Sequence, residues 1–151
     1  MVKQKSLLIL MLFWLGKNIW AEERVIRGLG MDWKPAVTFA QIGDQIRFTD
    51  MIGHDTESIA GMIPSGGKGW KSQMGEEGFT IKLEADGLYV FKCNPHVAVG
   101  MFGAIIVGDP REKPINLPEV QGNLQKVRIG RSSVKKILKK VIKAIESKAS
   151  R

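Results

Sequence analysis

The segment Cys93-Asn-Pro-His96-Val-Ala-Val-Gly-Met101 carries a thiol, an imidazole and a thioether within nine residues. It constrains the fold because stretches rich in β-forming residues flank it, Leu88–Phe91 before and Gly103–Val107 after. A tight loop between two adjacent strands would bring its three donor groups together at one end of a hairpin. The chain has one cysteine and two histidines, and the second histidine, His54, would reach this point from a separate strand end.

Two histidines, one cysteine and one methionine form the ligand set of a type 1 copper electron-transfer site. Zinc also accepts cysteine and histidine, but a thioether is a poor zinc ligand. Each residue alone has a structural alternative: Cys93 and Met101 as core residues, and His54 as a turn residue bonded to backbone. Together they predict one copper ion, with His54, Cys93 and His96 in a trigonal plane and Met101 as the axial ligand.

The first 21 residues have the organisation of a secretory signal peptide. Two early lysines precede a short apolar stretch, residues 6–15, and Ala21 offers a small residue before the cut. We therefore expect residues 1–21 to be removed and the mature chain to begin at Glu22 in an oxidising compartment; an uncleaved membrane anchor is the alternative. A lone cysteine there cannot form an internal disulfide, and copper ligation gives Cys93 a use.

The net charge of +8 is concentrated at the C-terminus. Residues 22–126 carry eleven basic and fourteen acidic side chains, whereas residues 127–151 carry nine basic and one acidic. No aromatic residue that could stack on bases accompanies the basic side chains of this tail. Nucleic acid is therefore not an expected partner.

Residues 25–110 show short β-forming segments separated by turn signals. Gly43-Asp44 and Asp86-Gly87 mark two turns, and residues 63–78 have the Gly, Ser and Lys content of a loop. Many short strands at this spacing predict a mainly β, Greek-key sandwich or barrel. The expected strands are Ala36–Ala40, Gln45–Thr49, Thr56–Ile59, Phe79–Leu83, Leu88–Phe91 and Gly103–Val107.

The pattern becomes helical after residue 115. Residues 117–126 are weakly helical, and Ser132 or Ser133 is expected to cap a longer helix. We expect residues 22–115 to form a β-domain with the copper site and residues 116–151 a basic, amphipathic helical extension. The apolar stripe of the longer helix comprises Val134, Ile137, Leu138, Val141, Ile142 and Ile145, with lysines 135, 136, 139, 140 and 143 on the other face.

The lysine-rich helix has alternative roles. The simplest is a helix packed on the barrel with its lysines in water. The lysines would otherwise dock an acidic redox partner or contact an anionic membrane surface. Removing residues 131–151 would destabilise the whole domain if the helix is structural, and would leave the copper site intact if the helix is an adaptor.

No acid–base machinery is apparent in the sequence. Both histidines are assigned to metal, so neither remains for a catalytic triad, and there is no C-x-x-C-H haem-attachment motif. We therefore expect a one-electron carrier rather than an enzyme. A copper carrier or copper-resistance protein is the alternative, although such proteins tend to use Met-rich or His-rich clusters, and the methionines after the signal segment are scattered at positions 31, 51, 62, 74 and 101.

Several segments have a combined pattern that points to a known family. They are Gly53–Ile59, Met62–Pro64, Trp70–Ser72, Gly87–Cys93, Pro95-His96, Gly100-Met101 and Val107–Asp109. Together they resemble the pseudoazurins, blue copper proteins of the plastocyanin and azurin (cupredoxin) family, over roughly residues 36–120. The Cys-x₂-His-x₄-Met loop is shared with plastocyanin, so the other segments and the helical C-terminus carry the distinction.

The resemblance implies a cupredoxin fold with C-terminal helices and a periplasmic protein that passes electrons among respiratory or denitrification partners. A nitrite reductase-like acceptor and a cytochrome-like donor would dock near His96, whose exposed edge passes the electron. We expect a monomer. The surrounding apolar patch would come from Pro95, Val97 and Val99, and the steering lysines from Lys68 and Lys71.

Two positions depart from the family pattern. Asp55 stands where pseudoazurins usually have an asparagine that braces the cysteine loop, and Asn94 stands where threonine is common. An ionised carboxylate accepts hydrogen bonds but cannot donate them. The hydrogen bonds around the cysteine loop are therefore expected to differ from the family pattern, which bears on both potential and affinity. Residues 24–35 match the family poorly, so the sequence leaves the first strand undefined.

Overall fold

Alternating buried and exposed side chains build the first sheet of the protein. The computed structural model describes residues 21–150. The first sheet contains β1 (Glu23–Leu29), β2 (Asp32–Lys34), β4 (Gln45–Thr49) and β6 (Thr80–Lys82), in the order β2-β1-β4-β6. Strand β1 pairs in parallel with β4, while β2 and β6 pair antiparallel to their neighbours. Ile26, Ile46 and Phe48 point from this sheet into the core and are fully buried.

The second sheet is covered on both faces. It contains β3 (Val37–Ala40), β5 (Glu57–Ser58), β7 (Gly87–Lys92) and β8 (Phe102–Val107), in the order β3-β8-β7-β5. Phe91 and Ile105 face the first sheet and join its core, whereas Val90 and Ile106 face the other way into a second core. Because side chains alternate along a strand, burial of both faces explains why every residue of β8 is buried and none is polar.

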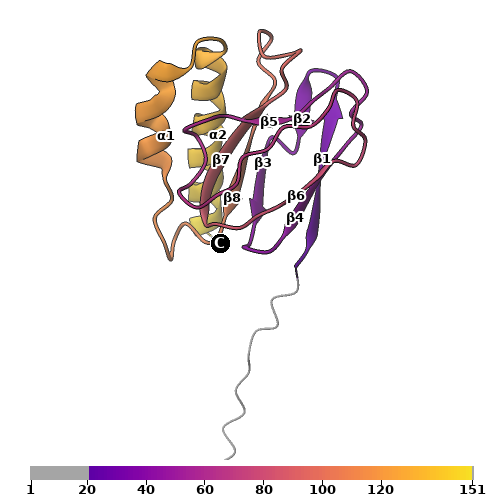
Figure 1. Ribbon diagram of the computed structural model, residues 1–151. Helices are drawn as coiled ribbons and strands as arrows, with labels where there is room; N and C mark the ends of the chain where they lie inside the picture. The colour runs from indigo at the N-terminus through magenta and orange to yellow at the C-terminus, as the bar shows by residue number, and fades with distance from the viewer. Residues whose placement is uncertain (1–20, 151) are drawn as a thin grey trace, which may run out of the picture.

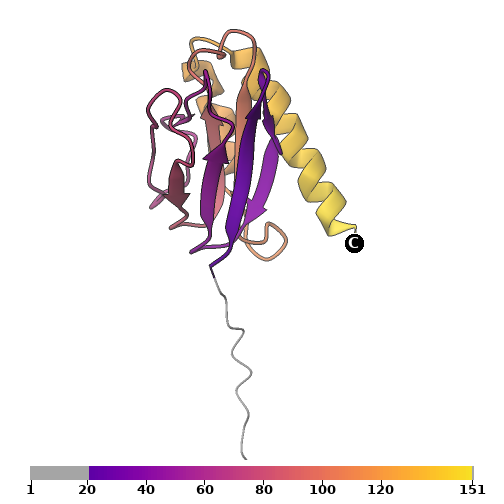
Figure 2. The ribbon, with the colours of Figure 1, turned by 90° about the vertical axis from the view of Figure 1, so that its right-hand side faces the viewer.

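The second core lies between this sheet and the C-terminal helices. These are α1 (Leu117–Asn123), the 3₁₀ turn η1 (Leu124–Lys126) and α2 (Arg131–Ala149). Figures 1 and 2 show α1 and α2 together on the outer face of the sheet that contains β7 and β8. The buried residues of the helices are Val120, Val134, Ile137, Leu138 and Val141.

The prediction of a mainly β sandwich with C-terminal helices is confirmed. All six expected strands are present, within one or two residues at their ends. The division of the chain between residues 115 and 116 remains a prediction. It coincides with the change from strands to helices, and residues from both parts pack together in the second core.

The expected signal peptide lies outside the described residues except for Ala21. Among the described residues, no helix is both long and apolar enough to span a membrane.

Two details of the sequence analysis are corrected. Strands β1 and β2 were not individually predicted; β2 is an edge strand of the first sheet, and β1 lies between it and β4. The prediction of Ser132 or Ser133 as the cap of the long helix is wrong, because α2 begins at Arg131 after Gly130, which has a φ of 78°. A Cβ on residue 130 would lie 2.5 Å from the ring of Phe102, so a glycine is required there.

Strands β4 and β7 end at the same end of the sandwich, at the top of Figure 1, where the predicted ligands lie. At the opposite end Asp44, whose side chain is 2% exposed, holds the start of β1. It accepts hydrogen bonds from the backbone N–H groups of Glu22 and Gln41 and from Arg24 Nε, each at 2.9 Å. Burial acts to raise the pKa of Asp44, but these hydrogen bonds outweigh it and lower the pKa below its usual value.

We expect Asp44→Asn to lower the free energy of unfolding by about 1–3 kcal/mol at neutral pH, since it places an amide against hydrogen-bond donors. Because folding lowers the pKa, the stabilisation is present above the pKa of the unfolded carboxyl and is lost as the pH falls through the folded-state pKa. Urea unfolding over this pH range should show the difference between wild type and variant shrinking in acid. The control is Asp32→Asn, an exposed aspartate paired only with Lys34, and an equal loss there would contradict the prediction.

We expect Leu138→Ala to lower the free energy of unfolding of the whole protein by about 2–5 kcal/mol, because Leu138 is 3% exposed in the second core. Lys139→Ala removes the next side chain, which points to solvent, and should change the stability by no more than about 0.5 kcal/mol. Chemical denaturation followed by circular dichroism measures both. Two transitions in Leu138→Ala, with the β-sheets unaffected, would show that α2 is an adaptor and not part of the fold.

Candidate metal centre

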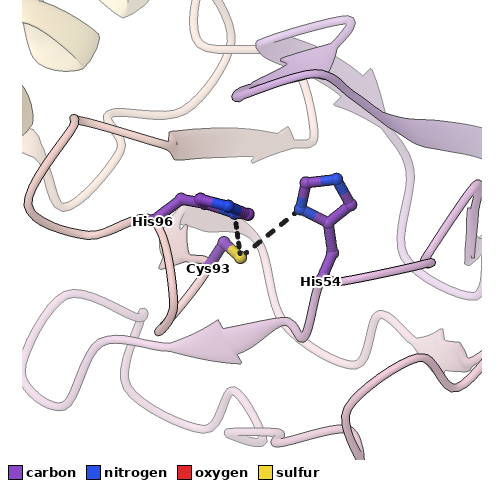
Figure 3. A group of neighbouring side chains, drawn as sticks. All are labelled: His54, Cys93 and His96. Carbon is purple, nitrogen blue, oxygen red and sulfur yellow. Dashed lines mark hydrogen bonds between the residues drawn. The ribbon is translucent and has the colours of Figure 1, made fainter.

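Three potential metal ligands converge at the upper end of the sandwich. The Sγ atom of Cys93 lies 3.6 Å from Nδ1 of His54 and 3.4 Å from Nδ1 of His96. One donor atom from each of these residues lies within 4.8 Å of the others. Figure 3 shows both imidazoles turned toward the sulfur, one from each side. The structure therefore brings together the thiol and both imidazoles that the sequence analysis selected.

The loop after β7 is held by its own backbone hydrogen bonds. Cys93 N–H donates to the carbonyl of Met101 at 3.0 Å, and Met101 N–H donates to the carbonyl of His96 at 3.1 Å. Met101 is fully buried and belongs to the same core cluster as Cys93. The backbone thus fixes the fourth predicted ligand beside the other two residues of the loop.

His54 is positioned by the loop after β4. Its N–H donates to the carbonyl of Met51 at 2.8 Å, and its own carbonyl accepts from the N–H of Gly75 at 2.8 Å. The preceding Gly53 has a φ of 75°, which a side chain rarely adopts. On the other side Gly28 of β1 leaves room for the ring, because a Cβ there would lie 2.9 Å from His54 Cδ2. These contacts hold the imidazole in one place.

Asp55 connects the two ligand loops. Its Oδ1 accepts a hydrogen bond from the backbone N–H of Asn94 at 2.6 Å, and its Oδ2 accepts one from Asn94 Nδ2 at 2.8 Å. Asn94 Nδ2 also donates to Glu57 at 2.7 Å. The two positions that depart from the family pattern therefore form a hydrogen-bonded pair. A carboxylate that only accepts is matched by an asparagine that donates.

The segment Trp70–Ser72 supports the same region from behind. The N–H of Thr56 donates to Ser72 Oγ, and the N–H of Ser72 donates to the carbonyl of Thr56, both at 2.9 Å. The indole Nε1 of Trp70 donates to Thr56 Oγ1 at 3.1 Å. The sequence analysis used this segment to recognise a family and to select Lys71 as a steering lysine; in the structure the segment also anchors the residue after Asp55.

Burial is the main influence on protonation in the site. It raises the pKa of the Cys93 thiol, although the N–H groups of Asp55 and His96 that donate to the sulfur act in the opposite direction. Burial also lowers the pKa of His54, and the neighbouring His96 adds to this effect. Both shifts favour the uncharged forms. A metal ion would displace the proton of the Cys93 thiol and would bind an unprotonated nitrogen of the neutral His54 imidazole.

The two imidazoles line an open concavity of about 530 Å³ at the surface. His54 is buried and His96 is half-buried, so His96 has the more accessible edge. Val99 beside it is 61% exposed, as the sequence analysis expected for an apolar patch. Ile52, which is 92% exposed, lines the concavity and enlarges this patch.

The two lysines expected to steer a partner lie in different surroundings. Lys71 Nζ is 3.8 Å from Glu57, the residue that accepts a hydrogen bond from Asn94, so Lys71 is close to the cysteine loop. Lys68 lines a separate hollow beside Trp70 and β6. Lys71 is therefore the better placed of the two to act near the loop.

Sequence reasoning missed Gly28 and Ile52 and did not link Asp55 to Asn94. The first two follow from the arrangement of β1 and the loop after β4, and neither belongs to a recognisable motif. The link between Asp55 and Asn94 was easier to predict than the roles of Gly28 and Ile52. Both residues of the link depart from the family pattern, and each is next to a predicted ligand in the sequence.

The donor set fits a copper ion. The thiol and the buried methionine are soft ligands, and the two imidazoles are intermediate ones. Together they suit both Cu(I) and Cu(II). Charged oxygen ligands, which harder cations prefer, are occupied elsewhere: both carboxylate oxygens of Asp55 accept hydrogen bonds from Asn94.

Comparison with known proteins gives a consistent result. Residues 22–108 match the family model described as copper binding proteins, plastocyanin/azurin family. The chain is 39% identical over 95 residues to a pseudoazurin of Methylorubrum extorquens, covering 62% of this chain and 63% of that one, and 39% identical over 84 residues to a pseudoazurin of Paracoccus pantotrophus, covering 54% and 57%. The chain thus spans less than two thirds of the length of these relatives.

The structure is also similar to a solved pseudoazurin from Sinorhizobium meliloti. The two share 33% sequence identity with a TM-score of 0.68, and the match covers 80% of this chain and 96% of the other. The resemblance to pseudoazurins that the sequence segments indicated is confirmed by these matches.

We expect Asp55→Asn to lower the free energy of unfolding of the metal-free chain by about 1–2 kcal/mol, because one amide N–H₂ would then face another. Amide hydrogen exchange should also become faster at Asn94, His96 and Val97. Glu119→Gln, which alters an exposed carboxylate on α1, is the control. Unchanged exchange in Asp55→Asn would show that the link does not hold the loop.

Proposed function

Because the chain belongs to the plastocyanin/azurin family of copper-binding proteins, we propose that it is a one-electron carrier with a single type 1 copper ion. The observation that carries this proposal is the convergence of the only thiol and the only two imidazoles of the chain within 4.8 Å. The ion would supply a Cu(II)/Cu(I) couple. His54, Cys93, His96 and Met101 would hold the ion.

The contribution of the protein is a rigid set of ligands. The carbonyl of His96 accepts hydrogen bonds within the loop, and the carbonyl of His54 accepts one from Gly75. Asp55 and Asn94 then tie the two loops together. Ligands held by the backbone in this way change little between oxidation states, which favours rapid electron transfer. Once both imidazoles are ligands, neither remains free as a general acid or base, which supports electron transfer and not catalysis.

We place the exchange of electrons at the exposed edge of His96. An apolar patch lies at this edge: Ile52 lines the concavity that leads to it, and the exposed Pro95 and Val99 lie in the same loop as His96. Val97 is half-buried against the second core. Such a patch allows a close, transient contact, and Lys71 adds a positive charge near the loop that would steer an acidic partner. We propose a nitrite reductase-like acceptor and a cytochrome-like donor in the periplasm, served by a monomer.

The competing function is a copper carrier or copper-resistance protein that moves the ion itself. A carrier must release its ion to a partner, which favours exposed ligands. In this structure His54 is 4% exposed, and Cys93 and Met101 are fully buried. Burial of this kind supports retention of the ion and therefore electron transfer.

We expect the chain from Glu22, loaded with Cu(II), to show an intense visible thiolate-to-copper band and a narrow copper hyperfine splitting in its electron paramagnetic resonance spectrum. Both should disappear in Cys93→Ser, while Thr38→Ala, which alters a buried hydroxyl on β3, should retain them. The blue form should also be reduced and reoxidised by one electron per chain. A pale chain with the spectrum of ordinary tetragonal copper would contradict this proposal and favour the copper carrier.

A further inference from the structure

The exposed side of α2 is strongly positive and does not take part in the packing of the protein. Lys135, Lys136, Lys139, Lys140 and Lys143, called here the lysine face, are all exposed. They occupy neighbouring positions on the helix because residues four apart lie one turn above each other. Within residues 21–150, none of the five forms an ion pair with a carboxylate.

The lysine face is held rigidly. The opposite side of α2 is buried in the second core through Val134, Ile137, Leu138 and Val141. Arg131 donates hydrogen bonds to the carbonyls of Val127 and Gln125 and so closes the turn before the helix. Near the other end, Lys148 lies 4.5 Å from the centre of the Phe39 ring. The apolar side cannot turn outward without unfolding the core, so α2 presents a mainly basic surface to its surroundings, with Glu146 as the one exposed acidic residue of the helix.

The position of the lysine face separates it from the site of electron exchange. Figure 2 shows α2 running along the flank of the molecule, away from the loops at its upper end. The cysteine loop contacts the start of α2: a Cβ on Gly100 would lie 2.8 Å from Ser133 Oγ, and a Cβ on Gly130 would lie 3.3 Å from the carbonyl oxygen of Val97. The lysine face extends from there along the helix. A redox partner that reached His96 would bind over the end of the sandwich. The lysine face would remain free for a second contact.

We propose that the lysine face docks this protein onto an anionic phospholipid surface. The five unpaired charges form a compact patch along one helix, which matches a plane of lipid phosphates. Because the apolar side of α2 is buried, the contact is electrostatic, without insertion into the bilayer. In this orientation the sandwich lies along the membrane, and the concavity at His96 opens sideways to partners on the same surface. The inference does not depend on copper.

The first experiment measures binding to vesicles of phosphatidylglycerol mixed with phosphatidylcholine, and to vesicles of phosphatidylcholine alone. It uses both the full-length chain and the chain from Glu22, which contains every strand and helix described here. We expect binding to the anionic vesicles at about 0.01 M salt and its loss at about 1 M salt, where charges are screened within a few ångströms. No binding to anionic vesicles by the chain from Glu22 would overturn the proposal.

The second experiment compares two triple variants of equal net charge. Lys136→Gln, Lys139→Gln and Lys143→Gln together remove the centre of the lysine face and keep good helix formers. Each lysine near the surface contributes about fivefold to partitioning, so this variant should bind anionic vesicles about a hundredfold more weakly. The control replaces three exposed lysines on the sheets and their loops with glutamine, Lys34, Lys68 and Lys82. It should bind within a few-fold of wild type.

Equal losses in the two variants would mean that only net charge matters, and would overturn the assignment to α2.

A third measurement tests orientation. On anionic vesicles, an amine-reactive reagent should modify the lysine face more slowly than in free solution, while Lys34, Lys68 and Lys82 react as before. If the lysine face shows no protection but its variant slows electron transfer to an acidic protein, the face serves a protein partner and the lipid proposal fails. Circular dichroism and thermal melting confirm that each variant is folded.

Discussion

The hydrogen bonds between Asp55 and Asn94 join two loops that come from different sheets, and the arrangement of donor groups depends on them. His54 follows β4 of the first sheet, whereas Cys93 and His96 follow β7 of the second. The loop that carries His54 and Asp55 leads into β5, whose Glu57 pairs with Lys92 at the end of β7. This backbone pairing brings the two loops together, and Asp55 adds a side-chain link through both of its carboxylate oxygens. The pairing and the link together hold Cys93 close to His54.

The burial of the second sheet on both faces supports the same site. Strands β7 and β8 form six residue pairs and lead directly into and out of the cysteine loop. One face of this pair packs on the first sheet and the other on α1 and α2. Helix α2 therefore stabilises the strands that carry the loop, although it contributes no donor group. The same packing that buries its apolar stripe directs its lysines outward, which makes a structural helix available for surface contact.

The success of the sequence analysis varied with the kind of signal. Strands β3, β4, β7 and β8 were predictable because each is a short β-forming segment between clear turns, with alternating polar and apolar residues in β4 and nearly continuous apolar residues in β7 and β8. Strands β1 and β2 were not, because charged residues and glycines interrupt such patterns in Glu23–Lys34. The place of β1 is set by its pairing with β4, and β2 in turn pairs with β1. The helix start also shifted, because contact between Gly130 and the ring of Phe102 outweighed the preference of serine for the cap.

The sequence by itself determined the chemistry of the candidate site and the faces of the long helix. One cysteine, two histidines and a methionine at fixed spacing define a donor set, and the spacing of Val134, Ile137 and Leu138 defines a buried side. Tertiary structure alone decided that Gly28 makes room for the His54 ring and that Ile52 borders the concavity. It also decided that Asp55 meets Asn94. These contacts join residues far apart in the chain, and such distances depend on how sheets pack, which local patterns in a single sequence do not encode.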